Sequence, residues 1–155
     1  MRALLQRVTH AEVSVNEKCV GSIGNGFLIL LGVGQNDTGQ QARQLAAKIA
    51  GLRVFTDEQD KMNLSLTEVN GGALVVSQFT LYADCRRGRR PNFIPAAPPQ
   101  IAEPLYEQFC NLLQEEGIGQ VERGVFGAEM KVSLCNDGPV TILLDTDELS
   151  LPKRH

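Results

Sequence analysis

Apolar and polar residues alternate over much of this 155-residue chain, and a period of two is typical of half-buried β-strands. The strongest signal is GGALVVSQFTLYAD (71–84), because its β-branched and aromatic residues suit a central strand. The apolar run FLILLGV (27–33) predicts a second buried strand after glycine-rich hairpin turns. Further strand-like segments are RALLQRV (2–8), AEVSVN (11–16), LRVF (52–55), QVERGVF (120–126), EMKVSLCN (129–136) and VTILLD (140–145).

Two other segments have the helical period of about 3.6 residues. Asp37, with Gln40 three residues later, resembles a capping box at the start of the first, which Gly51 can end. The second begins at Pro98 or Pro99, since proline is tolerated in a first helical turn. About eight short strands and two main helices, without regular β-α-β alternation, predict an α+β domain with a mixed or antiparallel sheet.

The length and composition predict one domain with a substantial core. Hydrophobic residues make up 43% of the chain and charged residues 21%, which are ordinary values for globular proteins. We expect the domain to span residues 1–145, followed by a loose tail at 146–155 that has little to bury. No apolar run is long enough to cross a membrane, and the first residues do not resemble a signal peptide, so we expect a cytoplasmic protein.

Cysteine and histidine provide little support for metal binding or nucleophilic catalysis. The four cysteines are too far apart for a Cys-x-x-Cys pair, so we expect no metal and no cofactor. Cys110 and Cys135 lie in helical and strand patterns, where packing is the better interpretation. A catalytic cysteine or serine would need a base, and the only histidines are His10 and His155, the last residue.

The motif CRRGRRP places four arginines within five positions, 86–90. With a formal net charge of -3, the chain as a whole does not attract polyanions. The arginines form either a solvated loop or a local phosphate contact, because guanidinium groups pair well with phosphate. The sequence does not decide between the two.

Polar residues interrupt the apolar run of the predicted central strand at SQFTL (77–81). Strand geometry would place Ser77 and Phe79 on one face and Gln78 and Thr80 on the other. These polar groups either bond across the sheet or line a pocket where the sheet is uncovered. Ser77 or Thr80 could act as a nucleophile, but no activating base is near in sequence.

A second motif, NDGPVT (136–141), contains the turn formers Asn136, Asp137, Gly138 and Pro139. Taken alone it predicts an ordinary hairpin loop. Together, however, SQFTL and NDGPVT resemble the two signature motifs of the D-aminoacyl-tRNA deacylase family. LLQRV, GFLILLGV, KMN, RRPNF and FGAEMKVSL agree with this resemblance, which extends to about Asp145.

The resemblance implies a homodimer of small α+β subunits with a barrel-like sheet and two active sites at the subunit interface. It implies hydrolysis of the ester between a D-amino acid and the 3′-terminal adenosine of tRNA. It also implies action on glycine attached to a non-cognate tRNA such as tRNA(Ala).

The same resemblance implies residue roles. Ser77, Gln78, Phe79 and Thr80 would line the pocket as its catalytic motif. Gly138 and Pro139, joined by a cis bond, would enter the partner subunit's site and reject L-aminoacyl-tRNA. The supporting residues would be Phe126 and Met130, which hold the adenosine and frame the pocket, and Arg7, which braces the Gly-Pro loop.

The mechanism and the class of protein each have alternatives. We favour a pocket whose backbone N–H groups near Phe79 and Thr80 stabilise the oxyanion, with the substrate's own 2′-hydroxyl activating water. The rival makes Thr80 the nucleophile. A non-catalytic RNA-end binding module using residues 86–90 and Phe126, and a purely structural homodimer, are the alternatives to an enzyme.

Overall fold

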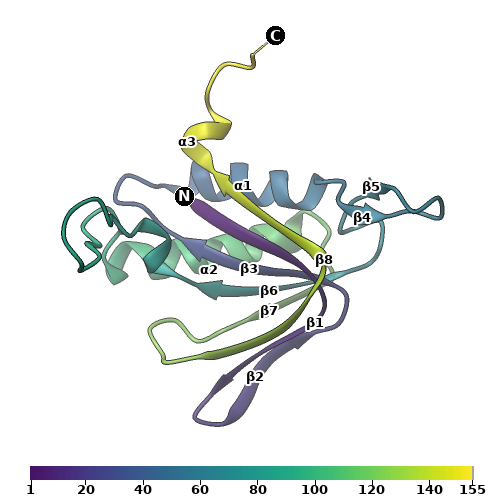
Figure 1. Cartoon of the computed structure of the whole chain (residues 1–155), viewed down its shortest axis with the longest axis horizontal. Coiled ribbons are helices and arrows are strands. Elements are labelled where there is room, and N and C mark those ends of the chain that lie inside the picture. Colours follow the sequence, from purple (N-terminus) through teal and green to yellow (C-terminus); the bar gives the residue numbers. More distant parts are fainter. Residues whose placement is uncertain (155) are drawn as a thin grey trace.

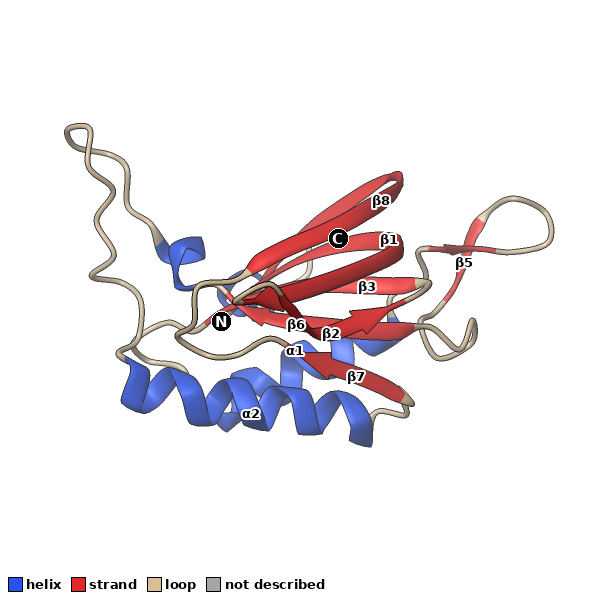
Figure 2. Ribbon diagram, turned by 90° about the horizontal axis from the view of Figure 1, so that it is seen from below, coloured by secondary structure: helices blue, strands red, loops and turns tan. Residues whose placement is uncertain are grey.

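The computed structural model describes residues 1–154 and shows a strongly curved sheet with two long helices against one face (Figures 1 and 2). The six strands of this sheet are β1 (Arg2–Val15), β2 (Lys18–Ile23), β3 (Gly26–Gly32), β6 (Gly72–Ser77), β7 (Gln120–Arg123) and β8 (Lys131–Asp145). A separate hairpin consists of β4 (Phe55–Thr56) and β5 (Met62–Leu64). The helices are α1 (Gly39–Gly51), α2 (Pro99–Glu115), the short α3 (Thr146–Leu149) and a 3₁₀ helix, η1 (Phe79–Tyr82). No helix within residues 1–154 is long and apolar enough to cross a membrane.

The sheet closes around β1. Residues 2–8 of this strand pair with β3, and residues 11–15 pair with β2. Strand β8 pairs with β1 along nearly the whole length of β1. These pairs are antiparallel, whereas β3, β6 and β7 are parallel neighbours. Because β3 and β2 share one edge of β1, the sheet curls into a nearly closed barrel, which confirms the predicted α+β class with a mixed, barrel-like sheet.

Two apolar cores occupy opposite faces of the sheet. On β3 and β6, Phe27, Ile29 and Val75 point toward α1 and α2 and belong to the larger core. The alternate residues Leu28 and Leu74 point into the barrel and form the smaller core with β1 and β2. This alternation follows from strand geometry and explains why β3 and β6 are apolar on both faces.

The central strand is shorter than its sequence predicts. It ends at Ser77, and η1 begins two residues later, so the prediction of a strand through Asp84 is wrong. The predicted division of residues 77–80 between two faces is wrong for the same reason. Ser77 pairs with Leu31, and β3 itself ends at Gly32, so the chain beyond Gln78 has no neighbouring strand to pair with.

Other boundaries also differ from the sequence predictions. The two N-terminal strands are one strand, β1, and the two C-terminal strands are one strand, β8. Thr38, and not Asp37, is the N-cap of α1 and forms a capping box with Gln41. The Asp37 carboxylate instead accepts hydrogen bonds from the N-terminal ammonium of Met1 (2.8 Å) and from the main-chain N–H of Gly34 (2.6 Å).

The segment predicted to be a loose tail begins with ordered structure. Residues 146–149 form α3, and the buried hydroxyl of Thr146 accepts a hydrogen bond from the Met1 ammonium at 2.8 Å. Met1 and Thr146 thereby join the two ends of the domain. His155 lies outside the described residues.

Candidate active site

A cavity of about 550 Å³ opens where β6 ends. Three segments meet there: the junction of β6 and η1, the loop leading into α2, and the loop between β7 and β8. The residues that line the cavity are Val33, Val76, Ser77, Gln78, Phe79, Phe93, Ala96, Ala97, Pro99, Ala102, Phe126, Gly127, Ala128, Met130 and Val132. The lining is mainly apolar with a few polar groups, as is usual for a small-molecule site.

Three residues of SQFTL contribute directly to this cavity. Ser77, Gln78 and Phe79 are among the lining residues, whereas Thr80 is not. The Thr80 side chain is exposed, and its hydroxyl lies in hydrogen-bonding contact with the side-chain amide of Gln78. The structure therefore brings three of the four motif residues to the cavity and leaves Thr80 beside it.

The start of η1 presents main-chain donors beside the cavity. The first N–H groups of a helix have no acceptor within the helix. Those of Phe79 and Thr80 also have no acceptor elsewhere in residues 1–154, whereas the Gln78 N–H is bound to Leu31 O at 2.8 Å. These two N–H groups are available to a bound oxygen atom.

Phe126 and Met130 line the side of the cavity formed by the loop after β7. The Phe126 ring packs against the Tyr106 ring, with ring centroids 6.0 Å apart. The Tyr106 hydroxyl donates a hydrogen bond to the main-chain oxygen of Val75 at 2.7 Å. Burial raises the pKa of Tyr106 above its ordinary value, so the phenol stays protonated and remains a donor. Met130 approaches the backbone closely: a Cβ at Gly124 would lie 2.7 Å from the Met130 sulfur.

Phe93 is a lining residue to which the sequence assigns no individual role. Its ring packs edge-on against Phe79, with centroids 5.0 Å apart and an interplanar angle of 73°. Both rings remain partly exposed, Phe79 to 55% and Phe93 to 37%. Together with Ala96, Ala97 and Pro99 it comes from NFIPAAPP, and the unusually apolar composition of this loop was the available signal.

Gly138 and Pro139 lie away from this cavity, at the turn within β8. Their peptide bond is cis, and Gly138 has a φ of +129°, which favours glycine. The side-chain oxygen of Asn136 accepts a hydrogen bond from the Val140 N–H at 3.2 Å and closes the turn. Asn136 therefore shapes a bend within β8, and the hairpin loop that the motif alone predicted is wrong, because both halves of β8 pair with β1 and not with each other.

Arg7 supports this turn from the adjacent strand. Its Nε donates to the main-chain oxygen of Asp137 at 3.1 Å, and Nη1 donates to the main-chain oxygen of Val54 at 2.7 Å. The residue is 8% exposed and lines a second, smaller cavity with Thr56 and Asp137. Arg7 thus links the β4–β5 hairpin to the residue preceding Gly138.

The two signature motifs are at different levels of the sheet. Arg7 pairs with Phe27, four residues before Leu31, and Leu31 pairs with Ser77. At about 3.3 Å per strand residue, the Arg7 level lies about 13 Å along the strands from the Ser77 level. The structure therefore does not bring Gly138 or Pro139 to the cavity of their own chain.

The described residues offer no obvious base or metal site at the cavity. His10 is exposed on β1 opposite Cys135 and does not line it. Across residues 1–154, no three His, Cys, Asp or Glu side chains are grouped so that they could hold a metal ion.

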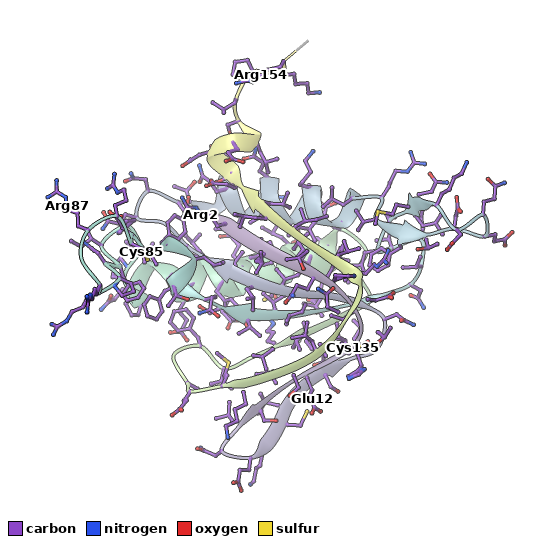
Figure 3. The ribbon with its side chains drawn as sticks, viewed as in Figure 1. Arg2, Glu12, Cys85, Arg87, Cys135 and Arg154 are labelled. Carbon is purple, nitrogen blue, oxygen red and sulfur yellow. The ribbon has the colours of Figure 1, made fainter. Side chains whose placement is uncertain are left out.

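Cys110 is buried, as predicted, but Cys135 is exposed, so the packing prediction for Cys135 is wrong (Figure 3).

Comparison with known proteins identifies close relatives. The family model described as D-Tyr-tRNA(Tyr) deacylase matches residues 4–145. A protein of Thermotoga petrophila named D-aminoacyl-tRNA deacylase is 57% identical over 149 residues, covering 96% of this chain and 99% of that one. A protein of the same name from Roseiflexus castenholzii is 58% identical over 156 residues, covering 100% of this chain and 99% of its own.

Solved structures share the fold. A structure titled c-Myc DNA Unwinding Element Binding Protein superposes with a TM-score of 0.89 at 39% identity, covering 94% of this chain and 98% of its own. A probable eukaryotic D-amino acid tRNA deacylase superposes with a TM-score of 0.79 at 20% identity, covering 92% of this chain and 97% of its own, and this likeness concerns the fold alone.

Proposed function

The chain belongs to the D-Tyr-tRNA(Tyr) deacylase family and is therefore a hydrolase, and we propose that it cleaves the ester between a D-amino acid and the 3′-terminal adenosine of tRNA. The observation that carries this proposal is the cavity at the end of β6. It is lined by Ser77, Gln78 and Phe79 of one signature motif and by Phe126 and Met130 opposite. Apolar and aromatic walls suit an adenine ring, and the few polar groups suit the ester. Charged tRNA as the substrate supports a cytoplasmic location.

Hydrolysis in this cavity depends on stabilising the oxyanion that forms when water attacks the ester. The free N–H groups of Phe79 and Thr80 are suited to that role. No described histidine lines the cavity, so we assign activation of water to the substrate's adjacent 2′-hydroxyl. The exposed position of Thr80 supports this choice over a Thr80 nucleophile.

Rejection of L-aminoacyl-tRNA is assigned to Gly138 and Pro139 of a partner subunit. Within one chain these residues lie about 13 Å along the strands from Ser77, so their own cavity is out of reach. β8 contains no fully buried residue although it pairs along β1, which supports coverage by a second copy. A main-chain wall held by Arg7 would exclude one direction of the side chain from Cα.

Glycine is a predicted second substrate of the same site. It has no side chain, so a wall that rejects L-residues by steric clash cannot reject glycine. We therefore propose that glycine attached to a non-cognate tRNA such as tRNA(Ala) is also released.

The proposed reaction is tested with catalytic amounts of protein on D-tyrosyl-tRNA and L-tyrosyl-tRNA. Multiple turnovers of the D-ester with little loss of the L-ester are expected. Binding without turnover would favour an RNA-end binding module. The absence of both binding and turnover would favour a structural homodimer.

Mixed dimers test whether the Gly-Pro turn acts on the partner's site. Gly138→Ala displaces the turn, because a Cβ there would lie 2.9 Å from the Val140 side chain and 3.1 Å from Arg7. Ala128→Trp fills the cavity of the other subunit. In a mixed dimer of one Gly138→Ala subunit and one Ala128→Trp subunit, the one open cavity belongs to the Gly138→Ala subunit. That cavity would face the intact turn of the Ala128→Trp subunit. Rejection of the L-ester, which the Gly138→Ala homodimer should lose, should therefore return. A mixed dimer that still hydrolyses the L-ester would place the turn at its own subunit's site.

A further inference from the structure

An exposed loop between η1 and α2 carries the four arginines of CRRGRRP. Its base is fixed by two main-chain hydrogen bonds between Asp84 and Asn92, at 2.7 and 2.9 Å. Every residue from 85 to 95 is exposed, and Gly88 at the tip has a φ of +66°. The loop extends well beyond the helices and sheet (Figure 2).

Three of the four guanidinium groups have no protein partner. Arg86 is used within the loop, since it donates two hydrogen bonds of 2.8 Å to the Asp84 carboxylate and lowers the pKa of that carboxyl to about 2. Arg87, Arg89 and Arg90 make no ion pair or side-chain hydrogen bond with any residue in the described range 1–154. Arg87 points away from the body of the protein (Figure 3).

The charge of this loop is opposite to that of the rest of the chain. No acidic residue occurs between Asp84 and Glu103, although the whole chain has 18 acidic against 15 basic residues. The three free arginines therefore form a local positive patch with no neutralising carboxylate on the loop itself. Such an arrangement attracts a polyanion locally without coating the protein with one.

The same loop continues into the wall of the cavity. Phe93 lies three residues after Arg90 and lines the cavity, as do Ala96 and Ala97. Three residues span at most about 10 Å, so the arginines lie close to the cavity mouth. A nucleic-acid strand carries a phosphate about every 3.4 Å of helix axis, so a strand leaving the cavity would bring several phosphates within reach.

We propose that Arg87, Arg89 and Arg90 form a docking surface for the phosphates of the acceptor end of tRNA while the terminal adenosine occupies the cavity. This inference rests on the proposed function and adds its RNA-binding surface. Guanidinium groups match phosphate in charge and in bidentate geometry. The interaction is sequence-independent, because phosphates carry no base information. It orients the substrate and leaves the choice between D and L to the cavity.

The test compares D-tyrosyl-tRNA with the 3′-D-tyrosyl ester of adenosine, which has the same ester and terminal nucleoside but carries no phosphate. The variant Arg87→Gln/Arg89→Gln/Arg90→Gln should lower kcat/KM for the tRNA by tenfold or more, on the order expected when several arginine–phosphate pairs are removed. Its kcat/KM for the adenosine ester and its D-over-L preference should equal those of the wild type. The salt dependence of kcat/KM for tRNA should flatten by about one logarithmic unit of slope for each arginine–phosphate pair that the variant can no longer form.

Two single variants serve as controls. Arg43→Gln removes an exposed arginine from α1, away from the loop, and should leave both substrates unaffected. Arg86→Gln removes the arginine that is paired with Asp84. It should flatten the salt dependence less than the replacement of Arg87, Arg89 or Arg90 by Gln.

Each contrary result is distinct. An unchanged salt slope in the triple variant would make the loop an ordinary solvated surface. An equal loss of kcat/KM on both substrates would mean that the loop supports the cavity and does not bind RNA. Failure of the proposed function appears in the wild type itself, as no hydrolysis of either substrate, and would overturn both proposals.

Discussion

The Arg7 guanidinium donates a hydrogen bond from Nε to the main-chain oxygen of Asp137, the residue that precedes Gly138, at 3.1 Å. The same side chain donates to Val54 O from Nη1 and is almost completely buried. One side chain on β1 therefore holds a turn in β8 against the hairpin formed by β4 and β5.

Arg7→Ala should reduce both stability and selectivity. Two main-chain oxygens would lose a charged donor, so the free energy of unfolding should fall by about 2–4 kcal/mol in urea denaturation. The released turn should raise hydrolysis of L-tyrosyl-tRNA relative to D-tyrosyl-tRNA, measured as a ratio of kcat/KM values. Arg53→Ala is the control, because Arg53 bonds Asn63 within the hairpin region and does not contact the turn. Unchanged D-over-L selectivity in Arg7→Ala would remove the proposed bracing role.

Thr80→Ala should retain most of the activity, because Thr80 is exposed and does not line the cavity. Wild-type enzyme acting on tRNA that ends in 2′-deoxyadenosine should instead lose about 10²–10⁴-fold in rate, the usual contribution of acid–base assistance. Single-turnover deacylation measures both. An inactive Thr80→Ala enzyme together with near-normal activity on the deoxy substrate would establish Thr80 as the nucleophile.

Gly124→Ala should affect substrate binding more than stability. The added methyl group would lie 2.7 Å from the Met130 sulfur and push this flexible side chain into the cavity. We expect KM to rise about threefold to tenfold, while the free energy of unfolding changes by less than about 1 kcal/mol. Gly119→Ala is the matched control, since a Cβ there meets no atom within 4 Å. Equal kinetics for the two variants would contradict the role given to Gly124.

Tyr106→Phe should cost about 1 kcal/mol of unfolding free energy, because it deletes a buried hydroxyl that donates to Val75 O at 2.7 Å. The cost is limited, since that oxygen also accepts from the Gly124 N–H at 3.0 Å. Tyr82→Phe provides the comparison. Its hydroxyl has no partner within residues 1–154, and its ring would keep the Arg2 guanidinium at 4.5 Å. Equal destabilisation by both changes would argue against the hydrogen bond as the cause.

Cys110 should be the slowest of the four thiols to react with a disulfide reagent in the native protein. It is fully buried in the larger core, and burial raises the pKa of its thiol to about 12, so little reactive thiolate forms. Cys85, exposed at the base of the arginine loop, should react fast, and Cys85→Ser should remove one fast thiol (Figure 3).

The same raised pKa makes stability fall at alkaline pH. The protonated thiol is favoured in the folded state, so its contribution is complete below the unfolded pKa of about 8.5. That contribution is lost as the pH rises toward 12. Cys110→Ala should weaken this alkaline decline in denaturation midpoints, whereas Cys85→Ser should leave it unchanged.

Several features could be predicted from the sequence because they depend on residues near one another along the chain. The strand period identified β3 and the first part of β6, and the proline pair located the start of α2. The resemblance of SQFTL and NDGPVT to two signature motifs of a known family identified the family. Phe126 and Met130 were also found in this way, since their segment belongs to the same resemblance.

Features that depend on distant partners were decided by the tertiary structure alone. The strand signal in GGALVVSQFTLYAD continues past Ser77, but β3 ends at Gly32 and leaves the residues after Gln78 without a neighbouring strand, so the chain turns into η1 and opens the cavity. Asp37 is a good capping residue, yet the ammonium of Met1 and the N–H of Gly34 already occupy its carboxylate, and Thr38 caps the helix instead. Local preference selects the elements, whereas the lengths of neighbouring strands and the positions of distant charges determine where each element stops. For the same reason sequence order could not reveal that the two motifs lie at different levels of one sheet, which is the geometry on which the proposed role of a second subunit rests.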